Sequence, residues 1–113
     1  MAKKNIILVT GGAGFVGTNL IKFFLKKTKY KLISLDNYSS GRKLNHIKSS
    51  RVKYLKGKTV NISSIIKNPK QIKSVFHFGE FARIYQSFLK MNECIDSNNV
   101  GSNAVFSFCL KNN

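Results

Sequence analysis

Three glycines stand where a protein chain can approach the phosphates of a nucleotide. Gly11, Gly14 and Gly17 come directly after the apolar run 6–9 and open a stretch with helical spacing of apolar residues. Glycine can reverse the chain, let the backbone approach a pyrophosphate and let a helix pack closely on a strand. The N–H groups and dipole of the helix then favour an anion. This strand, turn and helix therefore predict a dinucleotide-binding turn, and a purely structural glycine turn is the alternative.

Asp36 is the second candidate binding residue. It lies nineteen residues after Gly17, at the expected end of the second strand. A carboxylate there can accept both hydrogen bonds of an adenine ribose, and it would repel the extra 2′-phosphate of NADP. NAD is therefore the predicted cofactor. Arg42 and Lys43 follow within a polar loop and could reach that phosphate, so NADP remains the alternative.

The elements that must position these residues follow from the hydrophobic pattern. Strands are expected at 6–9, 31–35, 52–55 and 74–78. The apolar side of the first helix is expected to consist of Val16, Leu20, Phe23 and Phe24. A turn or two of helix at 61–68 should end at Pro69. Further helices are expected at 81–88 and 92–111, the last with Gly101, Val105, Phe108 and Cys109 on one side. The alternation predicts an α/β fold with a doubly wound parallel sheet.

Length and composition limit the other classes of function. The chain has 113 residues, enough for one compact domain, and 42% of them are hydrophobic. The net charge of +16 is compatible with a nucleic-acid or polyanion-binding domain, but the lysines are scattered, so we expect no nucleic-acid partner. Without a signal peptide or membrane span, a cytoplasmic protein with no membrane partner is expected. Cys94 and Cys109 are expected to be reduced, with no metal site.

Several segments, in order, resemble the NAD-dependent epimerase/dehydratase family of extended short-chain dehydrogenases/reductases, whose members act mostly on nucleotide sugars. They are TGGAGFVG at 10–17, DNYSSGRK at 36–43, VFHFG at 75–79 and NNVGS at 98–102. The resemblance covers nearly the whole chain. It implies the N-terminal half of a Rossmann-type sheet with strand order 3-2-1-4, truncated before the rest of the domain.

The resemblance also implies a cofactor-binding role for twelve residues. Gly11, Gly14, Phe15, Val16 and Gly17 would contact the pyrophosphate side, and Asp36 and Asn37 the adenosine ribose. Ser40 and Gly41 would lie near phosphate or ribose oxygens, Phe78 and Gly79 would line the nicotinamide-ribose side, and Asn98 would sit on the helix behind it.

Two positions depart from the family pattern. After the third strand the family usually has an acidic residue that accepts from the adenine amino group, whereas this chain has Lys58. Lysine only donates, so that contact is lost or replaced by a bond to a ring nitrogen. After the fourth strand the family commonly has small residues, whereas Glu80 and Phe81 follow here. Glu80 is expected to cap the next helix, and a contact with substrate is the alternative.

No catalytic residue is expected in this chain. The catalytic tyrosine and lysine of the family lie on a helix after a fifth strand, and the sequence contains no such segment. Tyr54 and Lys58 have Tyr-x-x-x-Lys spacing, but they fall at the end of an expected strand, so their side chains would not share one face. His46 lies in a loop and His77 in an apolar strand, and both are interpreted as structural.

The sequence is thus interpreted as residues 1–113 of an NAD-binding Rossmann domain, with the catalytic and substrate-binding part absent. The whole protein would be an enzyme that epimerises or dehydrates a nucleotide sugar after transient hydride transfer to NAD, and it could be a homodimer. The chain alone is expected to be inactive. The alternatives are a stand-alone, non-catalytic dinucleotide-binding module and a basic polyanion-binding domain.

Overall fold

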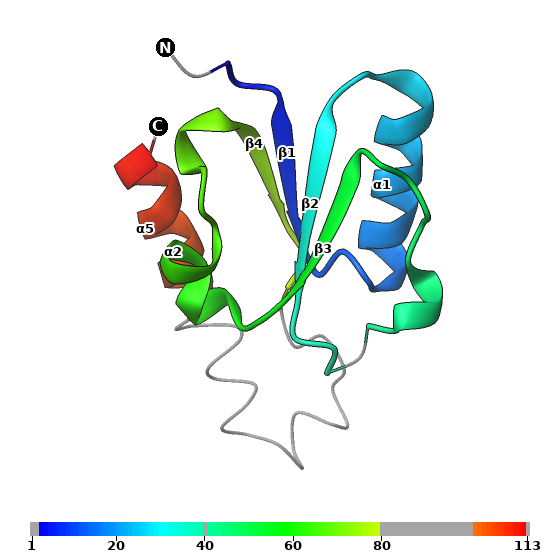
Figure 1. The fold of residues 1–113 in the computed structure, drawn as a ribbon. Helices are drawn as coiled ribbons and strands as arrows, with labels where there is room; N and C mark the ends of the chain where they lie inside the picture. The colour runs from blue at the N-terminus through cyan, green and yellow to red at the C-terminus, as the bar shows by residue number, and fades with distance from the viewer. Residues whose placement is uncertain (1–2, 40, 80–100, 113) are drawn as a thin grey trace.

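The computed structural model describes residues 3–39, 41–79 and 101–112, and within them four strands form one parallel sheet (Figure 1). The strands are β1 (Ile6–Thr10), β2 (Lys31–Asp36), β3 (Val52–Lys56) and β4 (Ile72–His77), in the order β3-β2-β1-β4. The expected order 3-2-1-4 is therefore confirmed. The fourth strand begins two residues earlier than expected and leaves Phe78 beyond its end.

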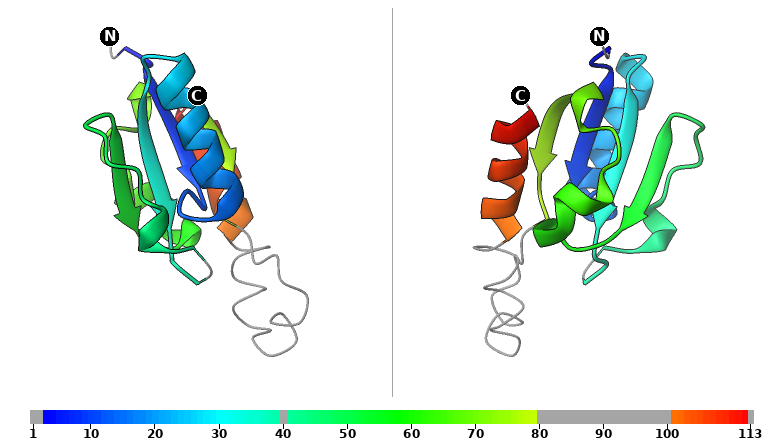
Figure 2. Two further views of the ribbon diagram at one scale, coloured as in Figure 1. Left: turned by 90° about the vertical axis from the view of Figure 1, so that its right-hand side faces the viewer. Right: turned by 60° about the vertical axis from the view of Figure 1, so that its left-hand side comes forward.

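Helices cover both faces of the sheet. α1 (Phe15–Lys27) lies on one face, and α2 (Ile62–Ile65) and α5 (Ser102–Asn112) lie on the other (Figures 1 and 2). Short 3-10 turns, η1 (Lys43–Asn45), η2 (Thr59–Asn61) and η3 (Pro69–Gln71), complete the described connections. The expected helix at 81–88, the first part of that at 92–111, and Cys94 fall outside the described residues. Within the described ranges no helix has the length and apolar character needed to span a membrane.

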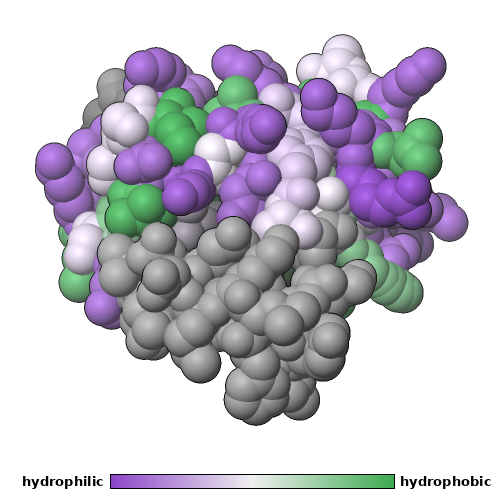
Figure 3. Space-filling model, turned by 90° about the horizontal axis from the view of Figure 1, so that it is seen from below, coloured by the Kyte–Doolittle hydropathy of each residue, from purple (hydrophilic) through white to green (hydrophobic). Residues whose placement is uncertain are grey.

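The carboxyl ends of the strands meet at one edge of the sheet. β1 pairs in parallel with β2 on one side and with β4 on the other, so Thr10 aligns with both Leu35 and His77. Asp36 aligns with Lys56 one position further along β2 and β3. This edge points down in Figure 1, and Figure 3 views the molecule from below. In such sheets ligands bind beyond the carboxyl ends, where the strand order reverses, which here is beside β1.

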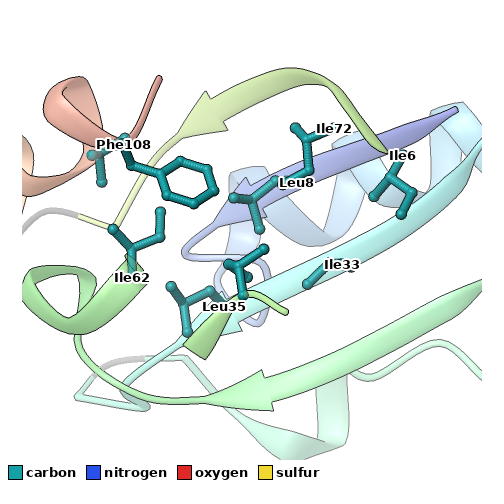
Figure 4. Close-up of a cluster of buried hydrophobic side chains, with 9 residues drawn as sticks. Ile6, Leu8, Ile33, Leu35, Ile62, Ile72 and Phe108 are labelled. Atoms are coloured by element: carbon teal, nitrogen blue, oxygen red, sulfur yellow. The ribbon is translucent and has the colours of Figure 1, made fainter. Parts of the chain in front are cut away.

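Buried clusters on both faces of the sheet explain the continuous apolar run at residues 6–9 of β1. Leucine and isoleucine side chains of the strands point toward residues of α2 and α5, as Figure 4 shows for Ile6, Leu8, Ile33, Leu35, Ile62, Ile72 and Phe108. A second cluster of Ile7, Val9, Ile21 and Leu32 lies on the α1 side. Alternate residues of β1 therefore face opposite layers, and all five of its residues are buried, as the apolar run predicted.

The expected apolar face of α1 was partly wrong. Val16 is 59% exposed and Phe23 54% exposed, although both were expected on the inner side. The buried residues are instead Gly17, Thr18 and Ile21. A helix turns about 100° per residue, so the face centred on Gly17 and Ile21 turns Val16 away from the sheet. Gly17 carries no apolar side chain, and hydrophobic spacing alone could not mark it as inward-facing.

Arg51 fastens the end of α1 to the start of β3. Its guanidinium donates to the carbonyl oxygens of Thr28 (2.7 Å), Tyr30 (3.1 Å) and Leu25. The last carbonyls of a helix have no partner within the helix, and a cation near them also interacts favourably with the helix dipole. One side chain thus satisfies three carbonyls at the place where α1 turns back into β2.

Replacing Arg51 with Met should lower the free energy of unfolding by about 2 kcal/mol, because the planar guanidinium bonds to three carbonyls are lost. The free energy of unfolding of Arg51→Lys should lie between those of the wild type and Arg51→Met, since an ammonium keeps the charge but cannot bond to three acceptors at once. Chemical denaturation monitored by circular dichroism measures the effect, with the exposed Lys53→Met as the control. An Arg51→Met protein with an unchanged midpoint would contradict this role.

Candidate cofactor site

Gly11 reverses the chain after β1 and brings it against the residue that follows β4. Its φ is +74°, a conformation that glycine adopts without strain. Its N–H donates to the Leu35 carbonyl at 2.7 Å, which joins the turn to β2. A Cβ at this position would lie 2.7 Å from the Phe78 carbonyl oxygen. Only a glycine therefore allows the ends of β1, β2 and β4 to meet this closely.

Gly17 and Gly14 differ in how closely other backbone atoms pack against them. A Cβ at Gly17 would lie 2.3 Å from the Gly11 carbonyl oxygen, so the first turn of α1 rests directly on the glycine turn. A Cβ at Gly14 would meet nothing nearer than that same oxygen, at 3.4 Å. Packing within the described chain thus explains Gly17 and leaves Gly14 without a packing reason.

The N-terminus of α1 presents the positive end of the helix dipole at the carboxyl edge of the sheet. Gly14 is the N-cap and has no side chain to cap the helix, and the first turn contains no acidic residue. The first N–H groups of a helix have no acceptor within the helix. Phe15 and Val16, which occupy this turn, are both exposed. The arrangement can accept an anion at the carboxyl edge of the sheet.

Asp36 ends β2 as a buried carboxylate. It is 8% exposed, and each of its oxygens accepts one backbone N–H, Oδ2 from Ala13 at 3.0 Å and Oδ1 from Tyr38 at 2.8 Å. A Cβ at Gly41 would lie 2.5 Å from Oδ2, so the loop passes directly over the carboxylate there. A carboxylate has about four acceptor positions, so two bonds leave it able to accept more.

The loop after β2 is bonded to the glycine turn. Arg42 donates its N–H to the Ala13 carbonyl at 3.1 Å, and the side-chain amide of Asn45 donates to the same oxygen at 2.7 Å. Asn37 is exposed, and its side-chain oxygen accepts the Ser39 N–H at 2.9 Å within a local turn. The side chains of Arg42 and Lys43 are exposed.

The segment after β4 is held at the end of β1 by Thr10. Phe78 donates its N–H to the Thr10 carbonyl, and Gly79 donates to Thr10 Oγ1, both at 3.0 Å. The same hydroxyl is hydrogen-bonded to His77 Nδ1 at 2.5 Å, and His77 Nε2 to the Ser102 hydroxyl at 2.9 Å. The Phe78 side chain is 41% exposed. Thr10, His77 and Ser102 therefore link β1, β4 and α5 beside Gly79.

The structure thus gathers most of the predicted site residues at one edge. Gly11, Gly17 and Phe78 meet at the glycine turn, and Asp36 and Gly41 meet beside Ala13. Ser40 and Asn98, and the expected helix cap Glu80, lie outside the described residues. Sequence reasoning missed Ala13, which acts through its backbone alone, and Thr10. The signal available for Thr10 was a hydroxyl residue between the apolar run 6–9 and the first glycine.

Other side chains with chemical potential fall outside this edge or serve packing. Tyr54 lies on β3 and the exposed Lys58 precedes η2, so the Tyr-x-x-x-Lys spacing is not on a helix, as expected. Burial raises the pKa of the Cys109 thiol, which favours the neutral form. The described residues contain no group of three His, Cys, Asp or Glu side chains suited to a metal ion.

Comparison with known proteins decides the family. The sequence model of the NAD dependent epimerase/dehydratase family matches residues 7–113. The chain belongs to this family. Its dependence on NAD confirms the expected cofactor at the level of the family. UDP-glucose 4-epimerase of Drosophila melanogaster is 32% identical over 121 residues, covering 95% of this chain and 34% of that protein. dTDP-D-glucose 4,6-dehydratase of Dictyostelium discoideum is 29% identical over 111 residues, covering 91% of this chain and 25% of that protein.

Solved structures agree with the fold. Epimerase Mth375 from Methanothermobacter thermautotrophicus superposes with a TM-score of 0.87 at 25% identity, covering 97% of this chain and 33% of that one. WbmF of Bordetella bronchiseptica, solved in complex with NAD+, gives a TM-score of 0.88 at 21% identity, covering 98% of this chain and 34% of that one. The Rossmann-type sheet is therefore confirmed. The chain spans about a third of the length of these proteins.

Substitution of the two glycines by alanine should separate their roles in folding. Gly17→Ala places a methyl group against backbone atoms and should lower the free energy of unfolding by about 3 kcal/mol. Gly14→Ala has room for the methyl at an ordinary φ and should change it by less than about 1 kcal/mol. Denaturant titration measures both, and equal losses would contradict the difference in packing.

Proposed function

We propose that the chain binds NAD across the carboxyl edge of its sheet, between the N-terminus of α1 and the end of β2. The observation that carries the proposal is the pairing of an uncapped helix N-terminus with a buried carboxylate that retains free acceptor positions. Ala13 stands between them, since it precedes Gly14 and donates its N–H to Asp36. The two features that this cofactor requires, a site for the anionic pyrophosphate and an acceptor for the ribose hydroxyls, are therefore adjacent.

On the pyrophosphate side, backbone N–H groups of the first turn of α1 would hold the phosphates. Gly14 supports this role because packing within the chain does not account for its missing side chain, whereas a bound pyrophosphate would. Gly11 and Gly17 shape the turn, and Phe15 and Val16 would contribute their backbone at the helix start. The exposure of these two side chains is consistent with a surface that is accessible to a ligand.

On the adenosine side, the remaining acceptor positions of Asp36 would receive the ribose hydroxyls. Asn37, Ser40 and Gly41 would lie along the same ribose, and the position of Gly41 over Oδ2 supports this. Lys58 stands where the family has an acidic residue, and as a donor it could reach only a ring nitrogen of the adenine. Phe78 and Gly79 would line the nicotinamide-ribose side, with Asn98 on the helix behind them.

For the whole protein, we propose an NAD-dependent epimerase or dehydratase of a nucleotide sugar. The named relatives act on UDP-glucose and on dTDP-D-glucose, and residues 1–113 correspond to about a third of each or less. We propose that this segment supplies the cofactor half of the NAD-binding domain, and that bound NAD supplies a transient hydride acceptor. Catalytic residues, nucleotide-sugar contacts and a homodimer interface would belong to the remainder, so the segment alone should not turn over substrate.

Gly14→Ala should weaken NAD binding at least about tenfold, because the added methyl group occupies the space that the pyrophosphate requires. Isothermal titration calorimetry at low ionic strength measures the dissociation constant. Phe23→Ala, which removes an exposed ring two turns further along α1, serves as the matched control and should bind like the wild type. Unchanged affinity in Gly14→Ala would refute the placement of the pyrophosphate.

The unmodified protein should bind NAD about tenfold more tightly than NADP, because Asp36 accepts the ribose hydroxyls and repels a 2′-phosphate. Asp36→Ala should abolish that preference, and Asp36→Asn, which keeps the shape but loses the charge, should reduce it. Calorimetric titration with both cofactors measures the ratio, and thermal unfolding shows whether each variant is folded. Equal affinities in the unmodified protein would overturn the role of Asp36.

A further inference from the structure

Three aromatic side chains form a connected group beside Asp36, and we call Tyr38, His46 and Tyr54 the aromatic latch. The Tyr38 hydroxyl and His46 Nε2 are hydrogen-bonded at 2.6 Å. The His46 ring stacks on the Tyr54 ring, with centroids 3.8 Å apart and planes 13° apart. The Tyr54 hydroxyl accepts the Ile47 N–H at 2.9 Å. The two contacts of Tyr54 therefore fasten the loop after β2 to β3, and the Tyr38–His46 bond joins two parts of that loop.

The latch reaches Asp36 through the backbone of Tyr38. Tyr38 has a φ of +62°, in the left-handed region, and in that conformation its N–H donates to Asp36 Oδ1 at 2.8 Å. This conformation is unfavourable for a bulky L-residue and persists where surrounding contacts hold it. The bonds from the Tyr38 N–H to Asp36 and from its hydroxyl to His46 are the contacts that hold it. Losing one of them favours relaxation of the other.

The latch also reaches the glycine turn. Asn45 directly precedes His46, and its side chain donates to the Ala13 carbonyl at 2.7 Å. Ala13 in turn donates its N–H to Asp36 Oδ2 at 3.0 Å. Asp36, Tyr38, His46, Asn45 and Ala13 thus form a closed circuit, and both hydrogen bonds to the carboxylate belong to it. The orientation of the carboxylate is set by the circuit as a whole.

We propose that the Tyr38–His46 hydrogen bond, supported by stacking on Tyr54, positions the Asp36 carboxylate and thereby sets the selectivity between NAD and NADP. This inference rests on the proposed binding of the adenosine ribose at Asp36. Held by two N–H groups, the carboxylate directs its remaining acceptor positions at the ribose hydroxyls and its charge at any 2′-phosphate. Tyr38 and His46 act through Asp36 and are positioning residues.

Release of the latch should change the two affinities in opposite directions. A carboxylate that loses the Tyr38 N–H can rotate, which weakens the bonds to the ribose of NAD and lessens the repulsion of a 2′-phosphate. The same loop carries the exposed Arg42 and Lys43, which could approach that phosphate once the loop moves. Substitution of a residue that supported only the fold would instead weaken the binding of both cofactors by the same factor. The ratio of the two dissociation constants therefore distinguishes positioning from a structural role.

The test compares variants that remove the hydrogen bond and keep the rings. Tyr38→Phe and His46→Phe should each reduce the NAD preference about fivefold, the size expected for one hydrogen bond. His46→Gln keeps a polar group able to bond the Tyr38 hydroxyl and should restore part of the preference. The double variant should resemble the single ones, because both remove one interaction. Tyr30→Phe, a tyrosine packed against Phe24 away from the latch, is the matched control and should leave the ratio unchanged.

Calorimetry with both cofactors gives the ratios, and thermal unfolding of each variant shows that the protein remains folded. An unchanged ratio in both phenylalanine variants, or an equal loss of affinity for both cofactors, would overturn the inference while leaving NAD binding intact. A wild-type protein that binds neither cofactor would instead overturn the proposed function, and the inference with it. His46→Gln acting like His46→Phe would show that the polar contact with Tyr38 does not carry the effect.

Discussion

The burial of one carboxylate organises the carboxyl edge of this sheet. Asp36 is the single acidic residue among residues 1–79 of a chain with a net charge of +16, yet it is almost fully buried. A buried charge is tolerated only when it is hydrogen-bonded. Here both bonds come from backbone N–H groups, one on the glycine turn and one on the loop after β2. Satisfying this carboxylate therefore fixes the turn and the loop relative to each other.

The second constraint is the close approach of backbone segments around Gly11 and Gly17. The absence of a side chain at each lets α1 rest on the turn and lets the turn touch the segment after β4. Thr10 completes this contact by binding the N–H groups of Phe78 and Gly79 through its backbone carbonyl and its hydroxyl. Hydrogen bonds thus join the ends of β1, β2 and β4, and the edge becomes a preformed surface. Preorganisation of this kind lowers the entropic cost of binding a flexible dinucleotide.

Hydrophobic spacing predicted the four strands. β1 is buried on both faces and is therefore a continuous apolar run, whereas polar residues interrupt the apolar residues of the other three strands. The buried face of α1 was predicted only in part, because its centre is a glycine that hydrophobic spacing does not register. His46 was correctly expected to be part of a loop, but its stacking on Tyr54 joins residues eight positions apart through the path of that loop. Such pairings depend on how the chain bends between elements, which local propensity does not specify.

The sequence by itself determined the class of fold, the glycine turn and the acidic residue at the end of the second strand. These follow from local rules, since residue type and spacing decide where a chain turns and where a strand is buried. Only the tertiary structure decided that Ala13 joins Asp36 to the loop, that Thr10 holds Gly79, and that Tyr38 adopts a left-handed conformation bonded to His46. Each depends on backbone groups, on the path of a loop, or on side chains brought together by parallel pairing of distant strands. Every residue type except proline carries the same backbone donor, so sequence cannot distinguish the one that will meet a buried carboxylate.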